Sequence, residues 1–312
     1  MFTVSKRLLA AAAATLLVAA CGGGGNDQYR AFQPARIVNF GDELSVFTAD
    51  AKKYSVNFAS ATVALDCKQY PLWIQALATS YGKVYTQCNP DNLTTTTAQT
   101  QATVGAKVAD VQAQVTALNA GSAPLGSTDL VTVLVGGHDV MELYATYPTQ
   151  SEAVITAALE ARGRTLAAQV NALAAGGSRV LIATMPDISL TPWAAAEKLA
   201  HTDTDRVALL GRLVTAFNTA MRTELINDGS KLGLLLGDDL VRGMVRAPSA
   251  FALVNVTDAV CATALPDCTP LTLITGVTSA PTYLWADTLR PASTFHAQFG
   301  LQAVSRTRTN PF

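Results

Sequence analysis

Short apolar segments alternate with long helical segments along this chain, and this alternation limits the possible fold more than any other feature. The clearest apolar segment, residues 130–135, is rich in β-branched residues and ends at Gly136 and Gly137, as buried strands often do. Similar predicted strands are residues 36–40, 179–183 and 232–236. Long helices are predicted over residues 105–118, 152–175 and 204–227. The pattern predicts an α/β fold with a mostly parallel sheet covered on both faces.

The length of the chain fits one domain. Its 312 residues and 32.6 kDa can form one large core. We assign residues 35–306 to a single domain and residues 307–312 to a tail. The other predicted elements are a hairpin insertion over residues 46–67, a helix from Pro71 to near Gly82, a loop over 94–97, an irregular segment over 250–280, a strand over 283–285 and a helix over 293–306.

The composition excludes several classes of protein. Hydrophobic residues make up 49% of the chain and charged residues only 14%, which is not typical of a disordered segment. A net charge of −1 provides no basic surface for nucleic acid. We therefore expect a folded protein, a monomer, with no nucleic-acid partner.

The N-terminus reads as a targeting segment. Lys6 and Arg7 precede an apolar run, residues 8–20, that is short for a membrane-spanning helix. The run ends in small residues before Cys21 and resembles a bacterial lipoprotein cleavage box. The alternatives are an ordinary secretory signal and an uncleaved anchor. The lipoprotein interpretation makes residues 1–20 a signal peptide and residues 21–34 a lipidated, glycine-rich tether. It predicts a cell-envelope protein anchored through Cys21 and facing the periplasm, in the outer membrane rather than the inner.

The cysteine count agrees with export. Without Cys21, four of the five cysteines remain, and an even number in an exported protein indicates two disulfides. Three connectivities are open, and the simplest joins Cys67 to Cys88 and Cys261 to Cys268. Four free thiols or a zinc site are the alternatives, but the spacings do not suit paired zinc ligands.

Four motifs follow the predicted strands or open the helices. The first reads Phe-Gly-Asp-Glu-Leu-Ser, and the third ends in Gly-Gly-His-Asp. The fourth has an aspartate, an arginine three residues later and then a proline, with His296 beyond. In chain order the motifs are residues 40–45, 102–108, 133–139 and 285–291. Together they resemble the blocks of the SGNH/GDSL hydrolases over residues 36 to about 303. The resemblance implies a three-layer α/β/α sandwich with a flavodoxin-like sheet.

In the resembled family these blocks hydrolyse esters. A serine attacks, a histidine takes its proton, an aspartate orients the histidine, and a glycine and an asparagine bind the oxyanion. The matching positions here are Glu43, Arg290, Asp287, Gly105 and His138. Arginine cannot act as a general base, and a carboxylate nucleophile would form an acid anhydride rather than a stable acyl-enzyme. The usual serine mechanism is therefore not expected.

The two main replacements carry opposite charges. We predict that Glu43 and Arg290 form a bidentate ion pair and that Asp287 is a second partner of Arg290. The alternative is that His138 serves as a recruited base. A metal held by Glu43, His138 and Asp287 is disfavoured because Arg290 would repel it, so no metal and no cofactor are predicted. We expect His296 to pack or to support the site.

Three functions remain open from the sequence. The first is an envelope lipoprotein with an inactivated site that binds an acyl ester, an acetylated glycan or a protein partner. The second is an active esterase or lipase with unconventional residues. The third is a purely structural lipoprotein whose pocket is closed by the Glu43–Arg290 pair.

Overall fold

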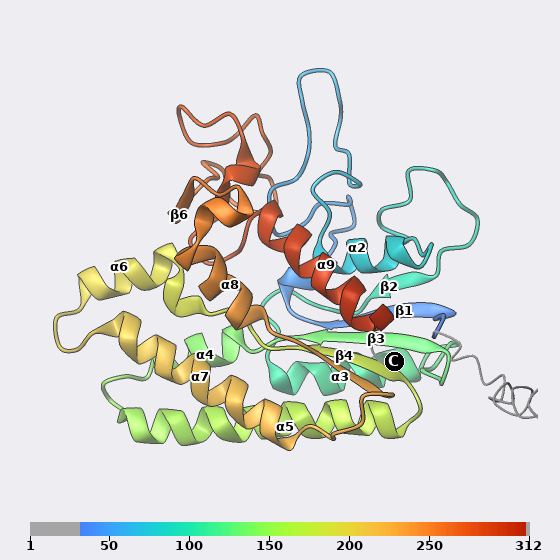
Figure 1. Ribbon diagram of the computed structural model, residues 1–312, viewed down its shortest axis with the longest axis horizontal. Coiled ribbons are helices and arrows are strands. Elements are labelled where there is room, and N and C mark those ends of the chain that lie inside the picture. The colour runs from blue at the N-terminus through green and yellow to red at the C-terminus, as the bar shows by residue number, and fades with distance from the viewer. Residues whose placement is uncertain (1–31, 310–312) are drawn as a thin grey trace, which may run out of the picture. The chain divides into compact units, whose positions relative to one another are not determined.

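A computed structural model describes residues 32–309 and contains a five-stranded parallel sheet (Figure 1). The strand order is β2-β1-β3-β4-β5, which is the flavodoxin-like order. The strands are β1 (Arg36–Gly41), β2 (Ala98–Thr100), β3 (Asp129–Leu134), β4 (Arg179–Ala183) and β5 (Leu232–Leu235). Every neighbouring pair is parallel. The predicted α/β class with a parallel sheet is confirmed.

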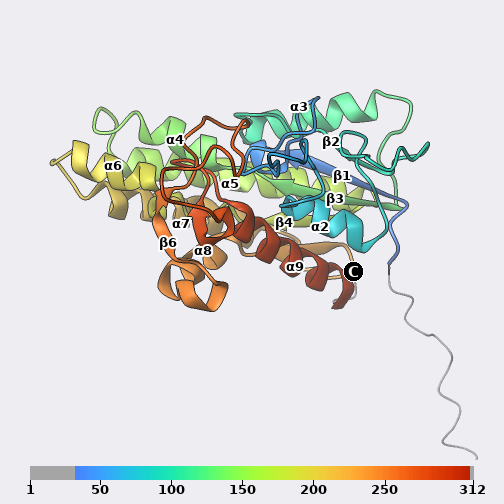
Figure 2. The ribbon, with the colours of Figure 1, turned by 90° about the horizontal axis from the view of Figure 1, so that it is seen from above.

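Helices cover both faces of this sheet. The helices on one face are α3 (Val108–Asn119), α5 (Glu152–Ala175) and α7 (Arg206–Glu224), and those on the other are α2 (Trp73–Ser80), α8 (Gly237–Arg246) and α9 (Ser293–Thr309). Neighbouring residues of a strand pack against opposite helix layers, because successive side chains point to opposite faces of the sheet. Val38 packs with the first group and Ile37 with the second. Figure 2 shows α3 and α9 on opposite sides of the strands. The three-layer sandwich is thus observed.

Some predicted elements need correction. The segment over residues 46–67 is not a hairpin of regular strands; it contains only isolated bridges, from Phe47 to Lys53 and from Phe58 to Asp66. The strand predicted over residues 283–285 is β7 (Tyr283–Trp285), but it pairs outside the main sheet. Its partner is β6 (Asn255–Ala259), inside the segment predicted to be irregular. Four further elements were not predicted from the sequence: β2, α8 and two short helices, α4 (Gly137–Tyr144) and α6 (Pro192–Ala200).

The ends of the domain differ slightly from the prediction. Phe32 lies over the guanidinium of Arg179 at 4.5 Å, and Pro34 is buried, so the last residues assigned to the tether belong to the domain. Helix α9 continues to Thr309, and Thr307 is buried, so the predicted tail begins inside this helix. The signal segment and Cys21 lie outside the described residues. None of the described helices is long and apolar enough to cross a membrane.

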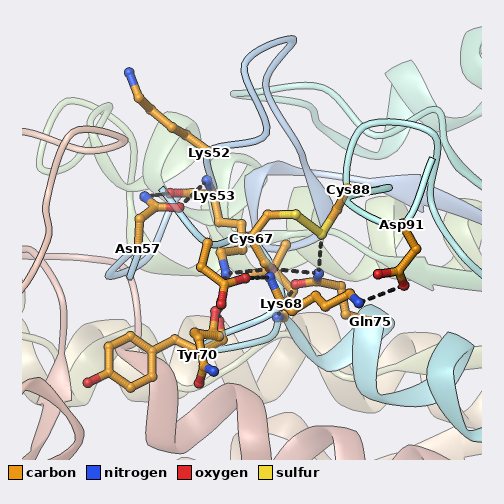
Figure 3. The surroundings of a disulfide bond; sticks show 12 residues. Lys52, Lys53, Asn57, Cys67, Lys68, Tyr70, Gln75, Cys88 and Asp91 are labelled. Carbon is orange, nitrogen blue, oxygen red and sulfur yellow. Dashed lines mark hydrogen bonds and ion pairs between the residues drawn. A yellow bond between two sulfur atoms is a disulfide. The ribbon is translucent and has the colours of Figure 1, made fainter. Parts of the chain in front are cut away.

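Both predicted disulfides are present, Cys67–Cys88 and Cys261–Cys268. The first lies beside a buried lysine, Lys53, whose Nζ donates to the carbonyl oxygens of Cys67 at 3.2 Å, Gln69 at 2.6 Å and Tyr70 at 2.9 Å (Figure 3). Burial lowers the pKa of Lys53 to about 8. The Lys53 hydrogen bonds hold the two ends of residues 53–70 together, and the first disulfide ties this segment to Cys88.

Candidate functional site

The five predicted site residues come together at the carboxyl ends of the strands. Glu43 opens a short 3-10 helix (Glu43–Ser45) directly after β1, and His138 lies in the first turn of α4, after β3. Gly105 lies in the turn between β2 and α3, while Asp287 and Arg290 follow β7. In parallel α/β sheets this edge is where ligands bind.

Two glycines let the chain reach this edge. Gly41 has φ of 126°, and an added Cβ would lie 1.8 Å from the carbonyl oxygen of Leu134. The side chain of Gln114 holds this turn, accepting from the N–H of Gly41 at 2.8 Å and donating to its carbonyl at 2.9 Å. Gly136 has φ of 130°, and its Cβ would lie 2.5 Å from the ring of Phe217. Both turns therefore require glycine.

The Glu43 carboxylate accepts from three donors and is only 4% exposed. The backbone N–H of Gly105 donates to Oε2 at 3.1 Å. Nε2 of His138 lies 2.9 Å from Oε1 and 2.8 Å from Oε2. Arg290 donates to Oε1 from Nε at 2.9 Å, and its Nη2 lies 2.8 Å from the same oxygen. Three residues from separate parts of the chain thus direct hydrogen-bond donors at one buried carboxylate of the protein itself.

The predicted partners of Arg290 are also found, with one difference in geometry. Nη1 donates to Oδ2 of Asp287 at 2.8 Å, and the backbone N–H of Arg290 donates to Oδ1 at 2.6 Å. The guanidinium also lies 5.9 Å from the ring centre of Tyr54. Its Nε and Nη2 both lie near Oε1 of Glu43, rather than spanning the two carboxylate oxygens as predicted. Oε2 accepts from Gly105, and Nε2 of His138 lies close to both oxygens.

These contacts shift the pKa values of the carboxylate cluster. Burial alone would raise the pKa of Glu43, but the hydrogen bond from His138 and the charges of His138 and Arg290 lower it to about 2. The hydrogen bond to Glu43 raises the pKa of His138. Burial, followed by the charge of Glu43, raises the pKa of the adjacent Asp42 to about 8. Near neutral pH, Glu43 is therefore an anion while Asp42 is a neutral acid.

A small cavity of about 50 Å³ adjoins the cluster. Its polar lining consists of Asp42, Glu43, His138 and Arg290. The other lining residues are Leu44, Gly137, Met141, Met185, Pro186, Ile188, Trp285, Leu289 and Pro291. The lining thus contains no serine, threonine, cysteine, tyrosine or lysine. Sequence reasoning missed the walls from α4 and the end of β4; the only hint was that Met185 and Pro186 follow a predicted strand.

Other chemistry-bearing residues do not extend this site. His296 is buried in α9 against the ring of Phe295, and burial and the charge of Lys53 lower its pKa to about 3. In the described part of the chain, no group of three or more histidine, cysteine, aspartate or glutamate residues could hold a metal ion. Arg290 separates Glu43 from Asp287 and pairs with both.

The chain is similar in arrangement to several solved structures. One is a member of the lipolytic protein G-D-S-L family from Veillonella parvula, with 11% identity and a TM-score of 0.41, covering 86% of this chain and 96% of that one. Another is an extracellular lipase from Streptomyces rimosus, with 15% identity and a TM-score of 0.43, covering 88% and 99%. A third is an acetylxylan esterase from Geobacillus stearothermophilus, with 11% identity and a TM-score of 0.41, covering 88% and 94%. No protein-family model and no curated protein matches the sequence. The activities in these names belong to those proteins.

Proposed function

We propose that this protein is an envelope lipoprotein of the SGNH/GDSL type that binds a small acyl group, of acetyl size, without hydrolysing it. One observation carries the proposal. The Glu43 carboxylate accepts hydrogen bonds from Gly105, His138 and Arg290, the residues that the sequence resemblance matches to the oxyanion and base positions of that family. An ester cannot bring its own oxygen to these donors while Glu43 holds them.

The cavity lacks the groups that ester hydrolysis requires. Its lining has no hydroxyl or thiol that could attack an acyl carbon. Glu43 is the carboxylate at the nucleophile position, and its two oxygens already face cationic or N–H donors. Arg290 stays protonated and cannot take a proton from a nucleophile. The geometry therefore disfavours the unconventional esterase.

The size and lining of the cavity suggest what it binds. A volume of about 50 Å³ is far below the ~300–1,000 Å³ of ordinary ligand pockets, so a long acyl chain would not fit. An acetyl group, with its methyl against apolar walls and its carbonyl near the polar end, suits this space. The two disulfides support an exported protein. An acetylated glycan of the cell envelope is therefore the ligand class that we propose.

The test combines turnover with binding in the purified full chain. We expect no hydrolysis of p-nitrophenyl acetate above background, and a higher melting temperature with O-acetylated xylobiose but not with xylobiose. Turnover that Glu43→Ala abolishes would instead favour the unconventional enzyme. Turnover that survives both Glu43→Ala and His138→Ala would mean that another site does the chemistry.

A pair of glycine substitutions locates the binding. Gly137 and Gly243 both lie in helices, and a Cβ added at either meets no atom within 4 Å, but only Gly137 lines the cavity. Gly137→Leu should abolish the stabilisation by the acetylated sugar, while Gly243→Leu should keep it. Stabilisation that persists in Gly137→Leu would contradict binding in this cavity. No stabilisation of the wild type, with no turnover, would favour the purely structural lipoprotein.

A further inference from the structure

Asp42 is a buried carboxyl group with unused hydrogen-bonding capacity beside the cavity. It is 5% exposed and lines the cavity. Its Oδ1 accepts from the backbone N–H of Leu44 at 3.1 Å, which caps the 3-10 helix. Within residues 32–309, its other oxygen, Oδ2, has no hydrogen-bond partner. Oδ2 is not one of the fully buried, unpaired side-chain atoms of the described residues, so it keeps some exposed surface beside the cavity and is open to a ligand.

The charged groups around Asp42 are already paired with one another. Those that face it are Glu43 from the 3-10 helix, His138 from α4 and Arg290 from the loop after β7. His138 and Arg290 both bind Glu43, and Arg290 also binds Asp287. Neither cation forms a hydrogen bond with Asp42 in the part of the chain that the structure describes. The negative charge of Glu43 instead disfavours a second carboxylate beside it.

The protonation state decides what Asp42 offers to a ligand. Burial and the charge of Glu43 raise its pKa to about 8, so the group is a carboxylic acid at neutral pH. Because Oδ1 already accepts from Leu44, the hydroxyl proton resides on Oδ2 in this arrangement. A neutral acid donates to a carbonyl oxygen, and the apolar walls accommodate the methyl group next to it.

We propose that Asp42, as a neutral carboxylic acid, donates a hydrogen bond to the carbonyl oxygen of the bound acetyl group and so selects acetyl esters and amides over free acetate. The inference rests on the proposed acetyl binding and adds its specificity-determining residue. Acetate would place a second negative charge beside Glu43 in a cavity with mostly apolar walls, which is unfavourable. A neutral acetyl group makes the same hydrogen bond without this cost.

The test measures the affinity of the full chain for two probes, N-methylacetamide and sodium acetate, by NMR titration from pH 6 to pH 9.5. The wild type should bind N-methylacetamide at pH 6 to 7 and lose about tenfold in affinity for each pH unit above about 8. Acetate should bind at least tenfold more weakly at pH 7. Asp42→Asn should bind N-methylacetamide with no loss at high pH, since its amide donates at every pH and its oxygen still accepts from Leu44.

The possible outcomes separate the two proposals. Binding of N-methylacetamide with the same pH profile in Asp42→Asn would overturn the role of Asp42 and leave acetyl binding standing. Equal affinity for acetate and N-methylacetamide would also overturn it. No binding of N-methylacetamide to the wild type at any pH would contradict the proposed function itself. If Asp42→Asn does not fold, the wild-type pH profile and the comparison of N-methylacetamide with acetate still test the role of Asp42.

Discussion

Two arginine–carboxylate clusters lie at the carboxyl edge of the same sheet, and they differ in what they can do. In the first, Arg290 binds Glu43 and Asp287, and the cluster borders the cavity. In the second, Arg242 of α8 binds Asp187 after β4, with Nε to Oδ2 at 2.7 Å, and Asp238 in its own helix. Both bury carboxylates, yet none of the charged residues of the second cluster lines the cavity.

The difference lies in the partners of the carboxylates. Asp187 accepts from the hydroxyl and N–H of Ser189, and Asp238 accepts from the hydroxyl of Thr184. The Thr184–Asp238 bond joins the end of β4 to the first turn of α8, and the Ser189 bonds hold the turn after β4, so these contacts connect elements of the fold. In the first cluster, Glu43, His138 and Arg290 come from distant parts of the chain and converge beside a cavity. A buried ion pair alone therefore does not identify a ligand-binding site. Charged side chains from distant segments that converge beside a cavity do.

The largest expected effect is a gain of activity in the first cluster. The double substitution Glu43→Ser with Arg290→His restores a hydroxyl and a base at the matching positions, beside Asp287 and Gly105. We expect p-nitrophenyl acetate hydrolysis at least about 10²-fold above the wild type. The matched change Asp187→Ser with Arg242→His should gain nothing. No gain in the first cluster would show that His138 or the cavity still blocks ester binding, and equal gains in both would end the distinction between the clusters.

The next effect concerns stability against pH. Asp42 has a raised pKa, so its contribution to stability is present below its unfolded value of 3.8 and is lost as pH rises toward 8. Glu43 has a lowered pKa, so its contribution is present above 4.5 and is lost as pH falls toward 2. His138 loses its contribution as pH rises above 6.5 through its raised pKa. Together these three groups therefore contribute most to the free energy of unfolding near pH 4, and their contribution falls as pH rises from 5 to 8.

Urea denaturation between pH 5 and pH 8 would measure this fall, and Asp42→Asn should reduce its slope by about 1 kcal/mol per pH unit. Asp187→Asn is the matched control in the second cluster and should keep the slope, because Asp187 has a cationic partner and does not adjoin Asp42. A slope unchanged by Asp42→Asn would contradict a buried neutral acid at this position.

A smaller effect is expected on the histidine. Glu43→Gln removes the hydrogen-bonded anion that contributes most to raising the pKa of His138. Burial and the charge of Arg290, which lower this pKa, then oppose only the smaller raising effect of Asp42. NMR titration should show the His138 pKa falling below its wild-type value. Asp187→Asn should leave it unchanged. A His138 pKa that stays raised in Glu43→Gln would mean that another group holds the imidazolium.

The smallest expected effect is at Tyr54, whose ring lies 5.9 Å from the guanidinium of Arg290. Tyr54→Leu should reduce the free energy of unfolding by about 0.5–1 kcal/mol if the cation–π contact contributes as partly exposed pairs usually do. In the background of Arg290→Met the same change should cost less, which a double-mutant cycle would measure. Equal costs in both backgrounds would mean that Tyr54 acts through packing alone.

Long periodic segments predicted their elements well, and short ones did not. The strand before Gly136 and the helix α5 were predicted because many residues repeat one pattern. The strand β2 has three residues, and α4 starts within the Gly-Gly-His-Asp motif, so neither is long enough to show a repeating hydrophobic pattern. β7 was predicted as a strand, but its pairing with β6 depends on a contact that no local pattern encodes.

The sequence by itself determined the α/β class, an even set of four cysteines that suits two disulfides, and the opposite charges at residues 43 and 290, because these follow from local patterns, the parity of cysteines and residue identity. The tertiary structure decided which cysteines pair. Only the tertiary structure decided that Glu43 takes the hydrogen bonds of Gly105, His138 and Arg290 together, and that Asp42 retains a free oxygen at a cavity. Distances between segments more than 90 residues apart, and the burial that shifts their pKa values, arise only when the chain packs.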